Sequence, residues 1–144
     1  MRRRLNEYRL LNKEIDNEIE RLERLQMKAY SPSSPNLTGM PKAPSSTFDR
    51  LAYAASKIAD LEDEISALMR ERDQERKDIE ELVKLLDKPD ERAVIRLRYL
   101  DSEEWDDIIV VLFGYKEDYD EKFDNYKQRV FRLHSSAVMK LSEM

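Results

Sequence analysis

The sequence predicts an all-α protein with a long coiled-coil or helical-hairpin arm, residues 1–88, and a small C-terminal head of three helices, residues 89–144. Three observations lead to this prediction. The 144-residue chain is 40% charged and 40% apolar with only two glycines, a composition typical of helices. Apolar residues recur with heptad spacing along the first part of the chain. This repeat stops after Pro89, where a more compact pattern begins.

The first expected helix runs from about residue 3 to residue 30. Spacing by seven places two rows of side chains on one face, with Leu11 and Leu25 beside them. The rows are Leu5, Asn12, Ile19 and Gln26, and Tyr8, Ile15, Leu22 and Ala29. Such a stripe is typical of a coiled coil or a helix bundle, in which the polar Asn12 and Gln26 can fix the register.

The composition changes between residues 31 and 46, which hold four of the five prolines and one of the two glycines. Proline removes a backbone donor and disfavours helix in the residue before it. We therefore predict a linker here. At about 16 residues it is long for a compact helical hairpin, so we expect it to wrap a surface or to span a gap.

The second expected helix runs from about residue 47, with Thr47 as its N-cap, to residue 87. An apolar 4-3 alternation continues over five heptads and is broken only at Arg72 and Glu75, where the arm ends or its partners change. At 1.5 Å per residue this helix is about 60 Å long, so the first helix can cover roughly half of it. We expect a second copy of the chain to cover the rest. The expected oligomerisation seam is Leu51, Ile58, Leu61, Ile65, Leu68, Ile79 and Leu82.

Three shorter helices are expected in the head. Asp90 is expected to cap the first helix, and Asp101 the second, with Glu104 as the return partner of a capping box. The second helix spans residues 103–113 and stops at Gly114. An acidic stretch, residues 116–124, precedes the last helix, about residues 125–141. The side chains that this helix is expected to bury are Val130, Leu133, Ala137 and Leu141.

The head contains the stretch ERAVIRLRYLDSEEWDDIIVVLFGY, followed by YKQRVFRLHSSAVMKL. These residues resemble region 4 of bacterial sigma factors, a helix-turn-helix domain. They are most similar to small phage proteins of Gram-positive bacteria that join such a head to a coiled coil, among them late-transcription activators and proteins without an assigned function. The resemblance covers roughly the last 50 residues. It implies that residues 105–113 form the positioning helix and residues 125–141 the recognition helix. About ten residues stand between these helices, where a sigma-like domain has a tight turn.

The last helix has an outward face that suits DNA. If Val130 and Leu133 point inward, a rotation of 100° per residue leaves a polar row exposed on the opposite side. Arginine and glutamine can each make two parallel hydrogen bonds to a base edge, and flanking cations suit phosphates. The predicted DNA-binding residues are Lys127, Gln128, Arg129, Arg132 and Ser135. The alternative is that these are ordinary solvated side chains on a surface helix.

Other kinds of site find little support in the sequence. His134 is the only histidine and there is no cysteine, so we expect no metal and place His134 at the edge of the core. Trp105 is expected to fill the same core. A calcium loop that begins at Asp118 has Phe123 and Arg129 where glycine and glutamate are diagnostic. No catalytic motif is present, so we expect no enzyme, no cofactor and no small-molecule substrate.

Two functions are therefore expected. The resemblance implies a DNA-binding phage-type transcriptional regulator that contacts double-stranded DNA or RNA polymerase and forms a homo-oligomer through its arm. The alternative is a protein-interaction or assembly factor, for instance in phage DNA packaging, with a degenerate helix-turn-helix. In both cases we expect a cytoplasmic protein with no membrane partner, because the N-terminal Arg2-Arg3-Arg4 is followed by a charged amphipathic segment rather than an apolar one.

Overall fold

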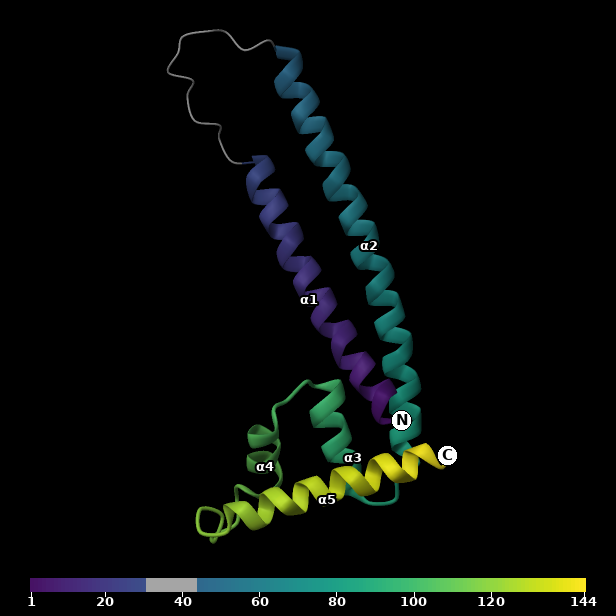
Figure 1. The fold of residues 1–144 in the computed structure, drawn as a ribbon, viewed down its shortest axis with the longest axis vertical. Helices are drawn as coiled ribbons and strands as arrows, with labels where there is room; N and C mark the ends of the chain where they lie inside the picture. The colour runs from purple at the N-terminus through teal and green to yellow at the C-terminus, as the bar shows by residue number, and fades with distance from the viewer. Residues whose placement is uncertain (31–43) are drawn as a thin grey trace. The chain divides into compact units, whose positions relative to one another are not determined.

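The computed structural model describes residues 1–30 and 44–144, with side chains in the second range from residue 48 onward (Figure 1). Every regular element in these ranges is helical, which confirms the all-α fold class. The elements are α1 (Arg2–Tyr30), α2 (Pro44–Lys84), α3 (Pro89–Ile95), one turn of π-helix η1 (Arg96–Leu100), α4 (Trp105–Phe113) and α5 (Phe123–Ser142). None of these helices has the length and apolar character that crossing a membrane requires. Most of the predicted linker, residues 31–43, lies outside the described residues.

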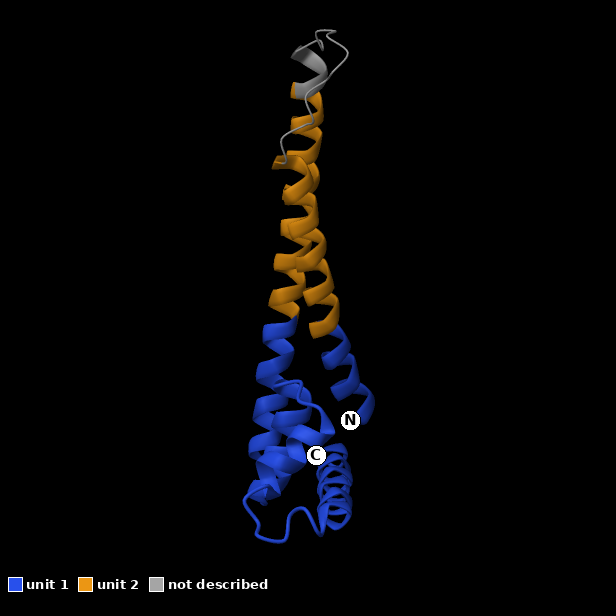
Figure 2. Cartoon of the chain, turned by 90° about the vertical axis from the view of Figure 1, so that its left-hand side faces the viewer, with its two compact units in different colours: residues 1–11, 72–144 blue, residues 12–71 orange. Residues whose placement is uncertain are grey.

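The structure divides the chain at a place other than the predicted boundary between residues 88 and 89. Unit 1 joins Met1–Leu11 to Arg72–Met144, and unit 2 is Asn12–Glu71 (Figure 2). Both long helices therefore contribute to both units. The division in α2 falls at the polar interruption, where Arg72 and Glu75 replace apolar residues of the heptad pattern.

Unit 2 contains parts of α1 and α2 that lie side by side (Figures 1 and 2). Ile15 of α1 is fully buried, and Ile58, Leu61 and Ile65 of α2 are at most 7% exposed within the single chain. Because α1 is the only other described helix of this unit, its heptad face covers that of α2. The burial of these side chains removes apolar surface from water, which stabilises the helix pair.

Unit 1 has a core to which the first turns of α1 and the last turns of α2 contribute. Leu5, Tyr8, Ile79, Val83 and Leu86 are buried together with side chains of the predicted head. The head side chains in this cluster are Ile95, Tyr99, Leu100, Ala137, Val138 and Leu141. The predicted boundary therefore divides one hydrophobic core, because the arm supplies about half of the buried side chains in the cluster.

Polar contacts connect the same elements. Arg4 of α1 donates hydrogen bonds to both carboxylate oxygens of Glu75, with Nη2 at 3.2 Å from Oε2. Arg76 of α2 donates to the carbonyl oxygen of Leu100 at 2.8 Å, and its Nη2 lies 3.6 Å from a carboxylate oxygen of Asp101. Arg4 thus connects α1 to α2, and Arg76 connects α2 to the turn that follows η1.

The helix starts differ from the predicted caps. α2 begins at Pro44, three residues before the predicted N-cap Thr47, because proline is well tolerated in the first turn of a helix. α3 begins at Pro89 for the same reason, so Asp90 lies in its first turn and Lys88 is the N-cap. Neither Lys88 nor Glu104, the N-cap of α4, makes a side-chain cap hydrogen bond. The predicted caps at Asp90 and Asp101 are therefore wrong.

The turn before α4 explains why Asp101 does not cap it. The amide of Asp101 donates to the carbonyl oxygen of Arg96 at 2.9 Å, which closes the π-turn, and the amide of Glu103 donates to Leu97 at 2.8 Å. Ser102 between them has a φ of 58°, in the left-handed region. The chain reverses there, and α4 starts at Trp105, two residues later than predicted.

Candidate nucleic-acid interface

Helix α5 holds the predicted recognition residues on its exposed side. Val130, Ala137 and Leu141 are buried and Leu133 is half-buried, which confirms the predicted inward face. Hydrophobic contacts with α3 and α4 thereby fix the rotation of the helix about its axis. The predicted outward residues Gln128, Arg132 and Ser135 are all exposed.

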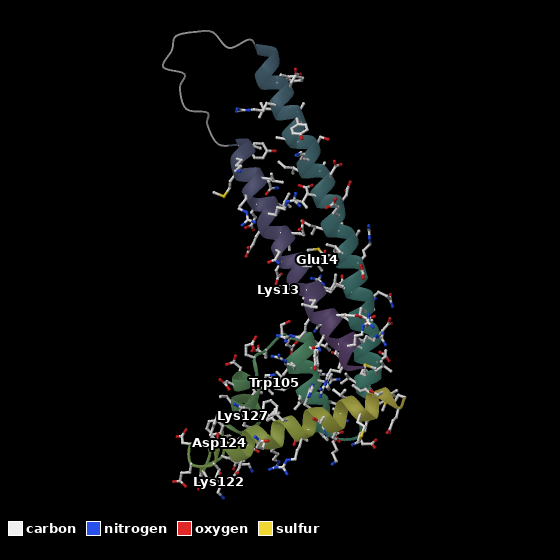
Figure 3. All side chains as sticks on the ribbon, viewed as in Figure 1. Lys13, Glu14, Trp105, Lys122, Asp124 and Lys127 are labelled. Carbon is white, nitrogen blue, oxygen red and sulfur yellow. The ribbon has the colours of Figure 1, made fainter. Side chains whose placement is uncertain are left out.

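The basic side chains of α5 remain available to a ligand. The helix carries four basic residues and one acidic residue, although the whole chain has a net charge of -5. The guanidinium of Arg129 lies 5.0 Å from the centre of the Phe113 ring, and Nε of Arg132 is 3.5 Å from the carbonyl oxygen of Gln128. Lys127 lies half-buried on the flank of the helix (Figure 3). Within the described residues, no carboxylate lies within 4 Å of these three cations.

A hollow of about 330 Å³ lies beside this face, between α5 and the start of α3. Lys88, Arg129 and Arg132 contribute its positive charge, and Ser136 contributes a hydroxyl. Glu91 is the one carboxylate among the lining residues. The position of Lys88 next to the two arginines brings together cations that are about 40 residues apart in the sequence.

The charge of Glu91 is already compensated inside the protein. Its side chain is 1% exposed and accepts hydrogen bonds from Nζ of Lys140 at 2.9 and 3.0 Å and from Oγ of Ser136 at 2.7 Å. Burial raises the pKa of Glu91, but the hydrogen bonds from Lys140 and Ser136 outweigh it and hold the pKa below its usual value. Glu91 therefore stays charged and paired with Lys140. Because Lys140 compensates its negative charge, Glu91 does little to weaken the positive charge that Lys88, Arg129 and Arg132 give the hollow.

Most other arginines of unit 1 have structural roles. Arg96 pairs with Glu80 at 3.2 Å, and Arg9 with Glu104 at 3.6 Å. Arg92 donates to the carbonyl oxygens of residues 86 and 87, just after the end of α2. These three guanidinium groups are held by partners within the chain. Among the described arginines of unit 1, four have no carboxylate within 4 Å, and two of the four lie on α5: Arg2, Arg92, Arg129 and Arg132.

His134 and Trp105 lie in the core, as predicted. Nε2 of His134 is 2.7 Å from the hydroxyl of Tyr99, and the Trp105 ring meets His134 edge-on at 5.0 Å between ring centres. Burial, together with the nearby positive charges of Arg2 and Arg98, lowers the pKa of His134 to about 4. The imidazole is therefore neutral at pH 7. Arg98 covers the other part of this cluster, with its guanidinium 4.6 Å from the Trp105 ring centre.

The acidic stretch of residues 116–124 is packed against the start of α5. Tyr119 stacks on Tyr126, and the Tyr126 hydroxyl donates to Oδ1 of Asp118 at 2.5 Å. Lys122 pairs with the same carboxylate at 3.3 Å. These hydrogen bonds lower the pKa of Asp118, with that from Tyr126 the larger cause. No group of three or more His, Asp or Glu side chains in the described part of the chain is arranged to hold a metal ion.

Helix α4 presents a surface of a different kind. Its inner side chains Ile108, Ile109 and Phe113 are buried, while Asp106, Asp107, Val110 and Val111 are exposed. At 100° per residue, these four exposed side chains lie within one 140° arc. We call them, together with Tyr115, the α4 face. Its carboxylates would repel phosphates, so this face is better suited to a protein than to DNA.

The predicted oligomerisation seam lies mostly inside the chain. Ile79 is buried in unit 1, Leu68 and Leu82 are half-buried, and the three seam residues of unit 2 from Ile58 to Ile65 are covered by α1. Only Leu51 is exposed, at 45%. The physical reason is the length of α1, 29 residues against 41 in α2, which covers more than the expected half. A homo-oligomer stays a prediction, but a second copy is not needed to cover this seam.

The chain matches no protein-family model, no curated protein and no solved structure. The resemblance to sigma region 4 therefore stays a prediction. Three residues of the hollow were not identified from the sequence: Lys88, Glu91 and Ser136. A heptad or helix-face pattern contains no signal for them, because their proximity depends on how α3 packs against α5.

Proposed function

We propose that the chain is a DNA-binding transcriptional regulator of the phage type, which acts in the cytoplasm and reads double-stranded DNA with α5. The observation that carries this proposal is the cluster of Lys88, Arg129 and Arg132 around one hollow on the exposed side of a helix whose other side is fixed in a core. A helix held in this way can enter the major groove without rearrangement of the domain.

The proposed roles follow from side-chain chemistry and position. Gln128 and Arg132 stand one turn apart on the exposed face, and each can make bidentate hydrogen bonds to a base edge. Ser135 continues the same row. Lys127, Lys88 and Arg129 lie to the sides and would contact phosphates, which position the helix on the duplex without reading its sequence. The resemblance to sigma region 4 supports the same assignment.

The test is the binding of the purified full chain to random-sequence duplex DNA over a salt series from about 50 to 200 mM. We expect an affinity that falls with salt, because each phosphate contact releases counterions. The double variant Arg129→Ala and Arg132→Ala should bind at least tenfold more weakly, since a base-contacting arginine contributes about 1–3 kcal/mol. Its salt dependence should also be shallower.

The matched control replaces Arg21 and Arg24, two exposed arginines of α1, by alanine. This control makes the same change in net charge but leaves α5 intact, so its DNA affinity should stay close to that of the wild type. The proposal is refuted if the folded wild-type chain does not bind DNA at low salt, or if both double variants lose affinity equally.

A second function is favoured by the α4 face. Exposed valines beside two aspartates form a surface that is unsuited to DNA and suited to a protein. We propose as the alternative that the chain is a non-enzymatic interaction or assembly factor, or contacts RNA polymerase through this face. In the pure assembly case, the Arg129 and Arg132 substitutions leave function unchanged, and substitution of Val110 and Val111 by serine abolishes it.

A further inference from the structure

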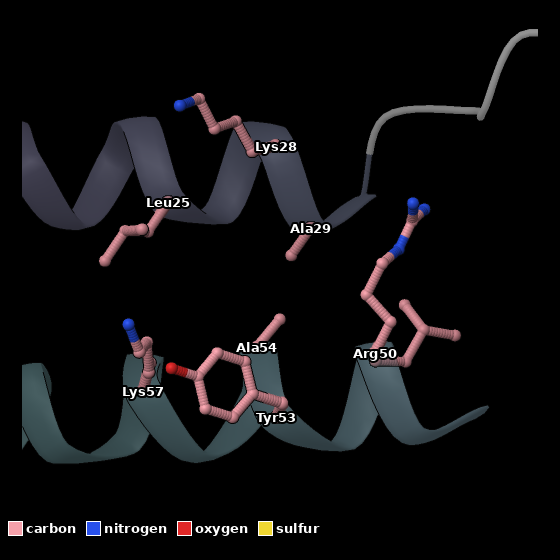
Figure 4. Close-up of a pocket in the computed structure, with 8 residues that line it drawn as sticks. Leu25, Lys28, Ala29, Arg50, Tyr53, Ala54 and Lys57 are labelled. Carbon is pink, nitrogen blue, oxygen red and sulfur yellow. The ribbon is translucent and has the colours of Figure 1, made fainter. Parts of the chain in front are cut away.

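A groove lies at the end of unit 2 where α1 finishes and α2 starts (Figure 4). Its volume is about 390 Å³. Leu25 and Ala29 point from α1 toward α2, and Ala54 points back toward α1, so the floor is apolar and its side chains are mostly small. Small side chains on both walls leave room for side chains of a third helix.

The rim of this groove is positively charged. Arg50 and Lys57 extend from α2 on the groove side, and Lys28 stands on the outer side of α1 (Figure 4). No carboxylate is among the residues that line it. Nζ of Lys57 lies 4.8 Å from the centre of the Tyr53 ring, which holds the cation at the rim.

Exposed apolar side chains are concentrated at the same end. Among the described residues of unit 2, the large apolar side chains that are exposed all belong to the last turn of α1 or the first turns of α2. They are Met27, Tyr30, Phe48, Leu51 and Tyr53. An exposed apolar cluster with a charged rim is typical of a docking surface.

The α4 face has the complementary chemistry. Val110 and Val111 are 54% and 60% exposed, and Asp106 and Asp107 stand one turn before them. The aspartates and the valines are four residues apart along the helix, a separation of about 6 Å. Lys116 lies over the ring of Tyr115 at 5.1 Å, at the edge of the face. Apart from this edge, the face combines negative charge with an apolar surface.

We propose that the α4 face of one chain docks into the groove at the end of the helix pair of a second copy. In this contact Val110 and Val111 lie on the apolar floor, while Asp106 and Asp107 meet Arg50 and Lys57 at the rim. The arrangement is a helix-in-groove interaction, in which an amphipathic helix places its apolar side between two others.

Charge distinguishes this arrangement from a symmetric one. A contact between two grooves would bring Arg50 and Lys57 of one copy against the same cations of the other, and like charges in contact are destabilising. The contact between groove and α4 face is heterologous, because different surfaces meet. A linear assembly keeps one unoccupied groove at one end and one unoccupied α4 face at the other, so it grows head to tail unless it closes into a ring.

The size of the groove limits the strength of each contact. It accommodates a few side chains rather than the roughly 800 Å² per partner of a standard stable interface. Self-association should therefore depend on protein concentration. It should weaken as salt rises, because exposed charges are screened over about 8 Å at physiological ionic strength.

The test is sedimentation velocity of the full chain between about 10 and 500 µM at low salt. The groove variant carries Arg50→Glu and Lys57→Glu, and the face variant carries Asp106→Lys and Asp107→Lys. Each variant alone lacks one of the two surfaces and should be monomeric. An equimolar mixture should associate again, because the native α4 face of the groove variant meets the native groove of the face variant, and the reversed charges of the two altered surfaces are also opposite in sign.

A control with Asp60→Lys and Glu64→Lys makes the same change in net charge as the face variant on exposed positions of α2, and it should associate as the wild type does. If the lysines in the first turn of α4 unfold the head, as reported by circular dichroism and by Trp105 fluorescence, Val110→Lys with Val111→Lys replaces that variant. A wild-type chain that stays monomeric, or a mixture of variants that does not pair, overturns the proposal. So does association that the groove variant leaves unchanged.

Discussion

The buried pair of Glu91 and Lys140 gives the sharpest prediction for stability. Replacement of Lys140 by methionine keeps most of the side-chain volume but leaves the Glu91 carboxylate with Ser136 as its remaining hydrogen-bond donor. Breaking a fully buried ion pair costs about 3–5 kcal/mol. The Lys140 side chain is 34% exposed, so water compensates part of the loss. We therefore expect the free energy of unfolding to fall by about 2–3 kcal/mol.

The pH dependence tests the cause of this loss. In the wild type, the pKa of Glu91 is lower in the folded than in the unfolded chain, so the pair stabilises the protein above the usual glutamate pKa and loses its contribution as pH falls through the folded pKa. Without Lys140, burial raises the pKa of Glu91. The difference between variant and wild type should therefore be largest at pH 7 and shrink toward pH 4.

The assay is urea unfolding followed by the fluorescence of Trp105, the only tryptophan of the chain, which lies in unit 1. Lys84→Met is the matched control, because Lys84 and Glu81 form a solvated pair on the surface, and its removal should change stability little. The double variant Glu91→Met with Lys140→Met should recover much of the loss, since no unpaired buried charge remains. A loss that is the same at pH 7 and pH 4 would refute the reasoning.

Three further predictions concern the core and its boundaries. Burial lowers the pKa of His134 to about 4 in the folded chain, below the value of about 6.5 in the unfolded chain. The stability that neutral His134 provides is therefore complete above pH 6.5 and declines toward pH 4, by up to about 1.4 kcal/mol per pH unit. His134→Gln should flatten this part of the dependence of unfolding free energy on pH, measured by urea unfolding. Leu61→Asp should reduce the helicity of unit 2 at every protein concentration, because the seam is covered within one chain. Ala59→Asp, at an exposed neighbouring position, should leave the helicity unchanged. A loss of helicity only on dilution would instead indicate a seam between chains. The fragment 89–144 should show no cooperative unfolding transition by circular dichroism, because it lacks the side chains that α1 and α2 contribute to the core of unit 1, and a sharp transition would contradict this.

Periodic features of the fold were predictable from the sequence. The heptad rows identified the faces of α1 and α2 that are buried, and a rotation of 100° per residue identified Val130, Ala137 and Leu141 as the inner side of α5. Such features are encoded locally, because the number of residues between two positions of a helix decides whether their side chains lie on the same face.

The boundary of the head and the polar contacts were not predictable in this way. Glu91 and Lys140 are 49 residues apart, and Leu5 lies more than 70 residues from Ile79, so no local pattern connects them. The capping predictions failed for a related reason. A side chain such as Asp101 has cap chemistry, but the π-turn before it and the left-handed Ser102 after it decide where α4 starts.

The acidic net charge of the chain does not by itself oppose DNA binding by α5. Charges act on a phosphate over about one Debye length, roughly 8 Å at physiological ionic strength, so the local arrangement decides the outcome. At the hollow, Glu91 is neutralised by Lys140, while Lys88, Arg129 and Arg132 lie beside it. In the acidic stretch, by contrast, Lys122 pairs with Asp118 and leaves several carboxylates exposed before the start of α5. These carboxylates would restrict the duplex to the side of α5 that faces the hollow, and their replacement by amides should strengthen DNA binding without altering which bases are read.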